Sequence, residues 1–133
     1  MIDETGEKWI EEFLKGRREE ECRLSLEVKM GYWDLKTIKL DEFRPGILSK
    51  VESGSNLTMA VMEIAPGKEG TAHSHPFDQC GYVVEGEIEI SMGDEKRLLK
   101  PNEVYFIPAG ITHNWKTFNL SAKILDVVGM IPK

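Results

Sequence analysis

The sequence predicts an all-β domain, an antiparallel sandwich or barrel, preceded by one α-helix. Beyond residue 22, short segments in which apolar residues alternate with polar residues follow one another along the chain. This alternation is the period of a half-buried β-strand. Glycine, proline and asparagine separate the segments at short, regular intervals, as turns do in antiparallel sheets. No internal repeat or low-complexity tract interrupts the pattern.

The first expected element is an amphipathic helix at residues 3–21. Its apolar residues recur at the spacing that places them on one stripe of a helix: Trp9, Ile10, Phe13 and Leu14. The polar face is acidic, which disfavours binding to a membrane surface. We therefore expect this helix to pack on the β-domain or on a second subunit.

The expected strands follow in order. Residues 23–30 form the first, because Leu, Val and Met alternate there with charged and small polar side chains. Further strands are expected at residues 47–51, 57–65, 79–84, 87–92, 95–99, 104–107, 113–118 and 122–128. Gly93 and Asp94 form a hairpin signal. Asn102 lies in a turn after a proline, where asparagine tolerates the left-handed backbone conformation.

Size and composition are those of one soluble domain. A chain of 133 residues can bury one real core, and its 41% apolar and 30% charged residues are ordinary for a globular protein. The net charge of −6 argues against a nucleic-acid partner, because phosphate binding needs a basic surface. There is no apolar run of membrane-spanning length and no signal peptide, so we expect no membrane association and a cytoplasmic location. Cys22 and Cys80 are too few for a disulfide framework and are expected to be reduced.

The functional signal is concentrated in residues 67–86 and in a later Pro-x-Gly-x-x-His segment that ends at His113. In a strand, residues two apart point to the same face, so His73 and His75 are expected to project together. Gln79 keeps that parity, while Cys80 faces the other way. Three imidazoles and one amide oxygen are a set that can close on a single metal ion. Isolated surface histidines are the alternative, but the His-x-His spacing between glycines favours a metal site.

This pattern resembles the two sequence motifs of the cupin superfamily. The first motif reads Gly-x5-His-x-His-x3,4-Glu-x6-Gly, and its glycines and histidines are present as Gly67, His73, His75 and Gly86. Gln79 stands where the glutamate is usual. The second motif reads Gly-x5-Pro-x-Gly-x2-His-x3-Asn, and its proline, second glycine and histidine are present as Pro108, Gly110 and His113. Asn102 and Thr117 stand where its first glycine and its asparagine are usual.

The resemblance spans about residues 40–130 and implies a cupin jelly-roll β-barrel. We expect residues 1–22 to form the N-terminal α-helix and residues 23–133 to form a single barrel domain. Cupins commonly pair through their N-terminal strands. The expected strand at residues 23–30 is therefore a candidate for the contacts of a homodimer, because an edge strand invites pairing with another chain.

Within the superfamily, the chain most resembles the small pectin-degradation cupins. Their pattern, His-x-His-Pro-x-x-Gln-x-Gly-Tyr-Val-x-x-Gly-Glu, is present at residues 73–87. These cupins open the ring of unsaturated galacturonate to a linear keto-uronate, and the resemblance implies four metal ligands, His73, His75, Gln79 and His113. It also implies a proton-transfer role for Asp126, for which the alternative is a strand-end acid facing solvent. Val128 stands where these cupins have an aromatic residue, which leaves the sugar substrate open.

The expected ligand set carries no negative charge, since it offers three neutral nitrogens and one amide oxygen. The alternative for Gln79 is that it forms a hydrogen bond near the site and does not bind the metal. A divalent Ni, Zn, Mn or Fe ion held by this set stays a strong Lewis acid, which favours polarising an oxygen-bearing substrate over redox cycling. The sequence therefore predicts a metal-dependent isomerase or lyase acting on a small, oxygen-rich, sugar-derived acid. An iron-dependent dioxygenase and a non-enzymatic module that binds a small molecule are the alternatives.

Overall fold

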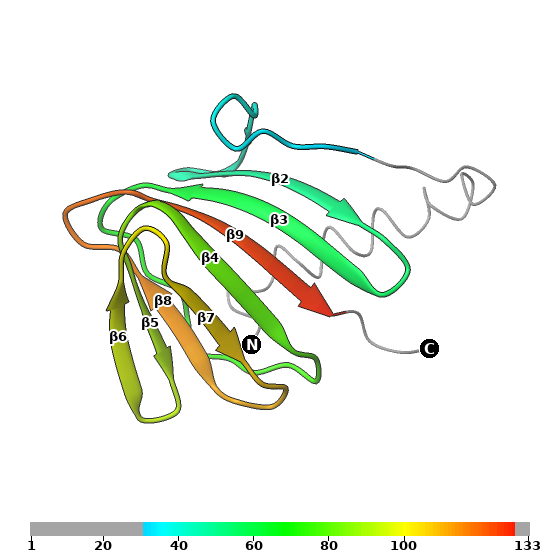
Figure 1. The fold of residues 1–133 in the computed structure, drawn as a ribbon. Helices are drawn as coiled ribbons and strands as arrows, with labels where there is room; N and C mark the ends of the chain where they lie inside the picture. Colours follow the sequence, from blue (N-terminus) through cyan, green and yellow to red (C-terminus); the bar gives the residue numbers. More distant parts are fainter. Residues whose placement is uncertain (1–30, 130–133) are drawn as a thin grey trace.

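The computed structural model describes residues 31–129, which form two antiparallel β-sheets packed face to face (Figure 1). The strands in this part of the chain are β1 (Asp41–Arg44), β2 (Ile47–Ser53), β3 (Leu57–Ile64), β4 (Gln79–Gly86), β5 (Ile88–Met92), β6 (Glu95–Leu99), β7 (Val104–Ile107), β8 (His113–Lys116) and β9 (Ala122–Gly129). The described residues contain no helix, and hence none that is long and apolar enough to cross a membrane. The prediction of an all-β domain is confirmed, whereas the helix expected at residues 3–21 and the strand expected at residues 23–30 lie outside the described residues.

The strand order explains which distant segments meet. The larger sheet has the order β1-β2-β3-β9-β4-β7 and the smaller sheet the order β6-β5-β8. The last strand, β9, lies between β3 and β4, so Asp126 pairs with Ala60 on one side and with Gly81 on the other. Figure 1 shows β9 crossing the middle of the larger sheet beside β4. This insertion brings the end of the described chain next to the strand that begins at Gln79.

The apolar core fills the space between the two sheets. From Ile124 to Val128, every second residue of β9 is buried, and Asp126 is the acidic member of this inward row. Fully buried apolar side chains come from both sheets and include Ile47, Ile64, Val83, Ile88, Ile107 and Val128. Burying a side chain of this kind stabilises a fold by roughly 1.5–3 kcal/mol. The core therefore fixes which face of each strand points toward the candidate site.

Most strands lie where alternation and turn residues in the sequence predict them, and one was missed. Strands β6 and β7 have the expected bounds, and the others differ by a few residues at their ends. Strand β1 was not expected, because its sequence Asp-Glu-Phe-Arg lacks an apolar alternation. It forms because the turn at Pro45 and Gly46 folds it back onto β2, to which it pairs across a register shift.

Two residues with positive φ angles, Gly86 and Asn102, lie at or near the ends of strands. Asn102 has a φ of 74°, which confirms the prediction that asparagine replaces a glycine in a left-handed turn. Gly86, at the end of β4, has a φ of 75°, and a Cβ atom there would collide with the carbonyl of Ser121. Only glycine meets both demands at this position.

Candidate metal centre

The histidines are positioned by backbone hydrogen bonds between two segments that are far apart in the sequence. His73 and His113 form an isolated antiparallel bridge, in which His73 N donates to His113 O at 3.1 Å and His113 N donates to His73 O at 2.8 Å. Gly110 N donates to His75 O at 2.8 Å. The segment before β4 forms no strand and is irregular apart from two isolated bridges, Glu69 with Lys116 and His73 with His113. The two histidines nevertheless approach the third one.

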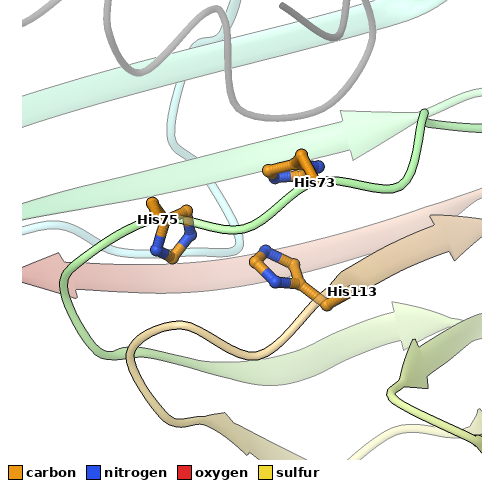
Figure 2. Close-up of side chains that lie close together, drawn as sticks. All are labelled: His73, His75 and His113. Atoms are coloured by element: carbon orange, nitrogen blue, oxygen red, sulfur yellow. The ribbon is translucent and has the colours of Figure 1, made fainter.

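Three imidazole rings form a cluster at the start of β8. One nitrogen from each of His73, His75 and His113 lies within 4.8 Å of the others. The ring centroids are 4.3 Å apart for His73 and His113, and 4.8 Å apart for His75 and His113. Figure 2 shows His73 and His75 reaching from the loop before β4 toward His113, which lies opposite them. His113 is buried, and the other two are half-buried.

The same contact fixes the tautomer of all three rings. Each Nδ1 is bonded to a backbone carbonyl two residues away: Thr71 O at 2.7 Å for His73, Phe77 O at 2.9 Å for His75, and Ile111 O at 2.9 Å for His113. A carbonyl oxygen only accepts, so Nδ1 carries the proton and donates. In a neutral ring, Nε2 then holds the lone pair. Metal-binding histidines are oriented in this way by the hydrogen bond of the other ring nitrogen.

Gln79 adds an oxygen to the cluster. Its side chain is buried at the start of β4, and its Oε1 lies 3.0 Å from His75 Nε2. Because the ring of His75 already donates from Nδ1, two electron-pair donors face each other here and repel unless a proton or a metal ion lies between them. Two ligands at roughly 2.1 Å from one ion, at right angles, are themselves roughly 3.0 Å apart. The spacing of these two atoms therefore suits shared coordination.

Asp126 lies directly behind Gln79. Its side chain is 5% exposed, so it is not an acid at a strand end facing solvent. Gln79 Nε2 donates to Asp126 Oδ2 at 3.3 Å, and the hydroxyl of Tyr105 donates to Asp126 Oδ1. The sequence pattern does not predict this contact of Tyr105. The available signal was Gly81, whose lack of a side chain leaves space for Tyr105 and Asp126.

A pocket inside the barrel opens from these groups toward an apolar wall. Its polar lining consists of Gln79, His113, Asn114 and Asp126. The rest of the lining is aliphatic and aromatic: Met62, Ile64, Ile90, Tyr105, Ile107, Trp115 and Ile124. Such a wall keeps water away and strengthens the polar interactions that remain.

Cys80 faces away from the pocket, as its alternation with Gln79 predicts. Its side chain is exposed, whereas that of Gln79 is buried. Partial burial of the Cys80 thiol raises its pKa, and the negative charge of Asp126 raises this pKa further. A thiol with a raised pKa is a poor nucleophile and a poor metal ligand at neutral pH.

The donor set fits a divalent transition metal. Imidazole nitrogens suit zinc, nickel and iron, and the amide oxygen of Gln79 is a harder neutral ligand that such ions also accept. The four residues that the sequence predicts as ligands lie together: His73, His75, Gln79 and His113. Asp126 reaches this group through Gln79.

The chain is similar to characterised cupins. The family model described as "Cupin domain" matches residues 60–128, a range that includes every residue of the candidate metal centre. Pectin degradation protein KdgF of Dickeya dadantii is 31% identical over 88 residues, which cover 65% of this chain and 80% of that protein. Tetracenomycin polyketide synthase protein TcmJ of Streptomyces glaucescens is 36% identical over 53 residues, or 39% of this chain and 36% of that protein.

Among solved structures, KdgF from Halomonas sp. has a TM-score of 0.68 at 24% identity, and the match covers 79% of this chain and 97% of that one. This likeness shows a shared fold of two packed antiparallel sheets. The prediction of a cupin fold is thereby confirmed. The family model covers more than half of the chain, and the similarity to KdgF extends over most of that relative's length. The chain belongs to the cupin family.

Proposed function

We propose that this cupin binds a divalent transition metal through His73, His75, Gln79 and His113, and that it is an enzyme acting on an oxygen-rich small acid such as an unsaturated uronate. One observation carries the proposal. All three Nδ1 atoms donate to carbonyls, which directs three Nε2 lone pairs into one cluster beside the amide oxygen of Gln79. A metal bound there supplies a Lewis acid that polarises an oxygen of the substrate.

Asp126 is the group that we assign to proton transfer. It lines the pocket beside His113 and Gln79 and offers a carboxylate to that pocket. In ring opening, this carboxylate takes the proton of the anomeric hydroxyl while the bond between the anomeric carbon and the ring oxygen breaks. The electron pair of that bond stays on the former ring oxygen as an enolate. The proton then returns to the enolate carbon, so the product is a linear keto-uronate with the atoms of the substrate.

The choice of a uronate is supported by the similarity to a pectin degradation protein. It is also supported by the neutral donor set, because an ion held by four neutral ligands keeps its full charge for an anionic substrate. Within the described lining of the pocket there is no lysine or arginine, so the ion is the positive charge that this part of the site offers to a carboxylate.

The test is to reconstitute metal-free protein with Ni, Zn, Mn or Fe and to follow unsaturated galacturonate. Ring opening removes the ultraviolet absorbance of its conjugated double bond. We expect bound metal at one ion per chain, loss of this absorbance and no oxygen uptake. His73→Ala and His113→Ala are expected to bind no stoichiometric metal, because each removes one of three imidazoles. Asp126→Asn is expected to keep the metal and to lower kcat by about 100-fold or more.

The other outcomes each exclude this proposal. Oxygen consumption by the iron-loaded protein identifies a dioxygenase. Tight binding of a uronate with no product identifies a non-enzymatic binding protein. Wild-type protein that takes up none of the four metals overturns the metal centre itself.

A second candidate substrate is an aromatic polyketide. A relative that belongs to a polyketide synthase shares 36% identity over 53 residues. A planar phenolic or enolic ligand that binds the metal-loaded protein more tightly than unsaturated galacturonate would favour this candidate.

We further propose that the protein is a cytoplasmic homodimer whose contacts include residues 23–30. The alternation at residues 23–30 predicts a strand, and a strand left at a sheet edge favours pairing with a second copy. Light scattering after size-exclusion chromatography tests the stoichiometry. A monomer at micromolar concentration contradicts this proposal without affecting the metal centre.

A further inference from the structure

We propose that Tyr105 and Asp126 determine which end of the Gln79 amide faces the histidines, and that Tyr105 is therefore a positioning residue for metal binding. The inference rests on the proposed metal centre and deepens it. Gln79 stands where the first cupin motif usually has a glutamate. Its neutral amide must therefore turn its oxygen, and not its nitrogen, toward the histidines.

The amide group of Gln79 is nearly symmetric in shape. The oxygen and nitrogen ends of glutamine have almost the same shape, so packing alone does not choose between them. Only the oxygen end can ligate a metal, since the amide nitrogen carries two protons and no available lone pair. If Gln79 turned by half a rotation about its last bond, the NH₂ group would face His75 Nε2. The centre would then lose its oxygen ligand.

Asp126 determines which end of the Gln79 amide faces the histidines. A carboxylate accepts hydrogen bonds and does not donate them, so the end of the amide that faces Asp126 Oδ2 at 3.3 Å must be the NH₂ end. The oxygen end then points to His75, where Oε1 lies 3.0 Å from Nε2. Gln79 and Asp126 are each 5% exposed, so bulk water competes little for these contacts. In such buried surroundings, turning the amide would place Gln79 Oε1 against Asp126 Oδ2, and these two oxygen acceptors would repel each other.

Tyr105 holds the carboxylate in place. It extends from β7, is 5% exposed, and donates from its hydroxyl to Asp126 Oδ1. The three strands involved lie side by side, with Gly81 of β4 paired to Tyr105 on one side and to Asp126 on the other. A Cβ atom on Gly81 would collide with both side chains. The missing side chain thus opens the path by which the hydroxyl of Tyr105 crosses β4 to reach Asp126.

For orienting residue 79, this chain of contacts is needed only while that residue is an amide. A glutamate presents an oxygen at both ends, so no neighbour has to orient it. The relay from Tyr105 through Asp126 to Gln79 therefore belongs to the glutamine form of the centre, and substituting residue 79 should make the other two residues dispensable for metal binding.

The experiment measures metal affinity in two backgrounds. Metal-free wild-type protein, Asp126→Leu and Tyr105→Phe are titrated with Co²⁺, by calorimetry and by its visible absorption spectrum, which reports the ligand set. The same two substitutions are then made in Gln79→Glu protein. With the native glutamine, Asp126→Leu should weaken binding by about 10-fold or more, the usual cost of losing an outer partner of a metal ligand. Tyr105→Phe should weaken it in the same direction by less, and both should change the spectrum.

In Gln79→Glu protein, neither substitution should weaken Co²⁺ binding or change the spectrum. Asp126→Asn tests whether a carboxylate is needed, because its amide can accept from Gln79 Nε2 or, when turned, donate to Gln79 Oε1. Its Co²⁺ affinity should lie between those of the wild type and Asp126→Leu. Thermal unfolding of each metal-free variant shows whether it is folded. If Asp126→Leu is unfolded, Tyr105→Phe still tests the inference, because it removes only one oxygen atom.

Two results overturn the inference. The first is unchanged Co²⁺ affinity and spectrum in Asp126→Leu and Tyr105→Phe with native Gln79. The second is an equal loss of affinity in both backgrounds, which would mean that the two residues merely support the fold. If wild-type protein binds no metal at all, the proposed metal centre fails instead, and the two failures are thereby distinguished.

Discussion

Gly81 shows, at the scale of single residues, how a missing side chain shapes the site. An added Cβ atom would meet the ring of Tyr105 and the carboxylate of Asp126. We expect Gly81→Ala to lower the free energy of unfolding by about 1–3 kcal/mol, the usual cost of overpacking a filled interior. Because the collision separates Tyr105 from Asp126, it should weaken metal binding as well. Urea unfolding and Co²⁺ titration measure the two effects.

Gly54→Ala is the matched control for this substitution. Gly54 is exposed, and the nearest atom to an added Cβ would be Leu57 O at 3.8 Å, an ordinary contact. Stability and metal affinity should change little. If Gly81→Ala behaves like Gly54→Ala, the space between Tyr105 and Asp126 is not needed.

The thiol of Cys80 makes a pH-dependent prediction. Burial, and secondly the charge of Asp126, raise its pKa, so at a given pH below that pKa less of it is thiolate than in free cysteine. In a Cys22→Ser background without metal, Cys80 should react more slowly with iodoacetamide than free cysteine at pH 8, and its half-maximal rate should lie at higher pH. Asp126→Asn should recover part of the difference. A midpoint at or below that of free cysteine would contradict this account.

At this scale the sequence predicts the types of residue but not their partners. The three histidines and Gln79 are found by spacing, and Asp126 by resemblance. The contact of Tyr105 with Asp126 spans 21 positions and depends on which strands are neighbours, so no local pattern contains it. Its trace in the sequence is the glycine at position 81, whose purpose is visible only when three strands are aligned.

Among the elements, the segment that leads from β3 to His73 is anchored at its start by the side chain of Thr117. Thr117 is 1% exposed, its hydroxyl donates to Ala65 O at 2.7 Å, and it accepts from Lys68 N at 2.9 Å. We expect Thr117→Val to cost about 1–3 kcal/mol of unfolding free energy, because it leaves two backbone groups without this partner. Loosening residues 65–70 should also weaken metal binding at His73. Urea unfolding and metal titration measure both.

Thr117→Ser separates the hydroxyl from the methyl group. It keeps both hydrogen bonds and removes one methyl, so stability should fall by about 1 kcal/mol and metal affinity should be retained. Equal losses for the valine and serine variants would show that packing, not the hydroxyl, secures this segment.

Elements whose ends are marked by turn residues are predictable without an alternation. Strands β6 and β7, with the sequences Glu-Lys-Arg-Leu-Leu and Val-Tyr-Phe-Ile, lie at their expected residues because turns at residues 93–94 and 101–103 mark their starts. Strand β1 depends on its hairpin with β2, and the path through His73 and His75 depends on hydrogen bonds to residues near His113. Both are set by tertiary contacts, which override local preference. Histidines two apart therefore converge here without forming a strand.

At the scale of the whole molecule, the sheets bring together residues from three regions of the sequence. His75 comes from the segment before β4 and Gln79 from the first residue of β4, whereas His113 comes from the start of β8 and Asp126 from β9. The resemblance to cupins predicts this convergence, whereas alternation alone gives strands without their order. The insertion of β9 between β3 and β4 is the step that places Asp126 behind Gln79.

A metal ion that joins such distant segments should stabilise the fold as a whole. Binding to the native state alone adds RT ln(1 + [L]/Kd), or about 2.7 kcal/mol when free metal is at 100 times its Kd. We expect Ni²⁺ or Zn²⁺ to raise the melting temperature of wild-type protein and EDTA to reverse the rise. His113→Ala should show no rise, since it removes the ligand that links the two segments. Mg²⁺, which prefers oxygen ligands, is the matched control and should leave the melting temperature unchanged. An equal rise in His113→Ala protein would mean that the stabilising ion does not need His113, which would contradict the proposed three-histidine centre.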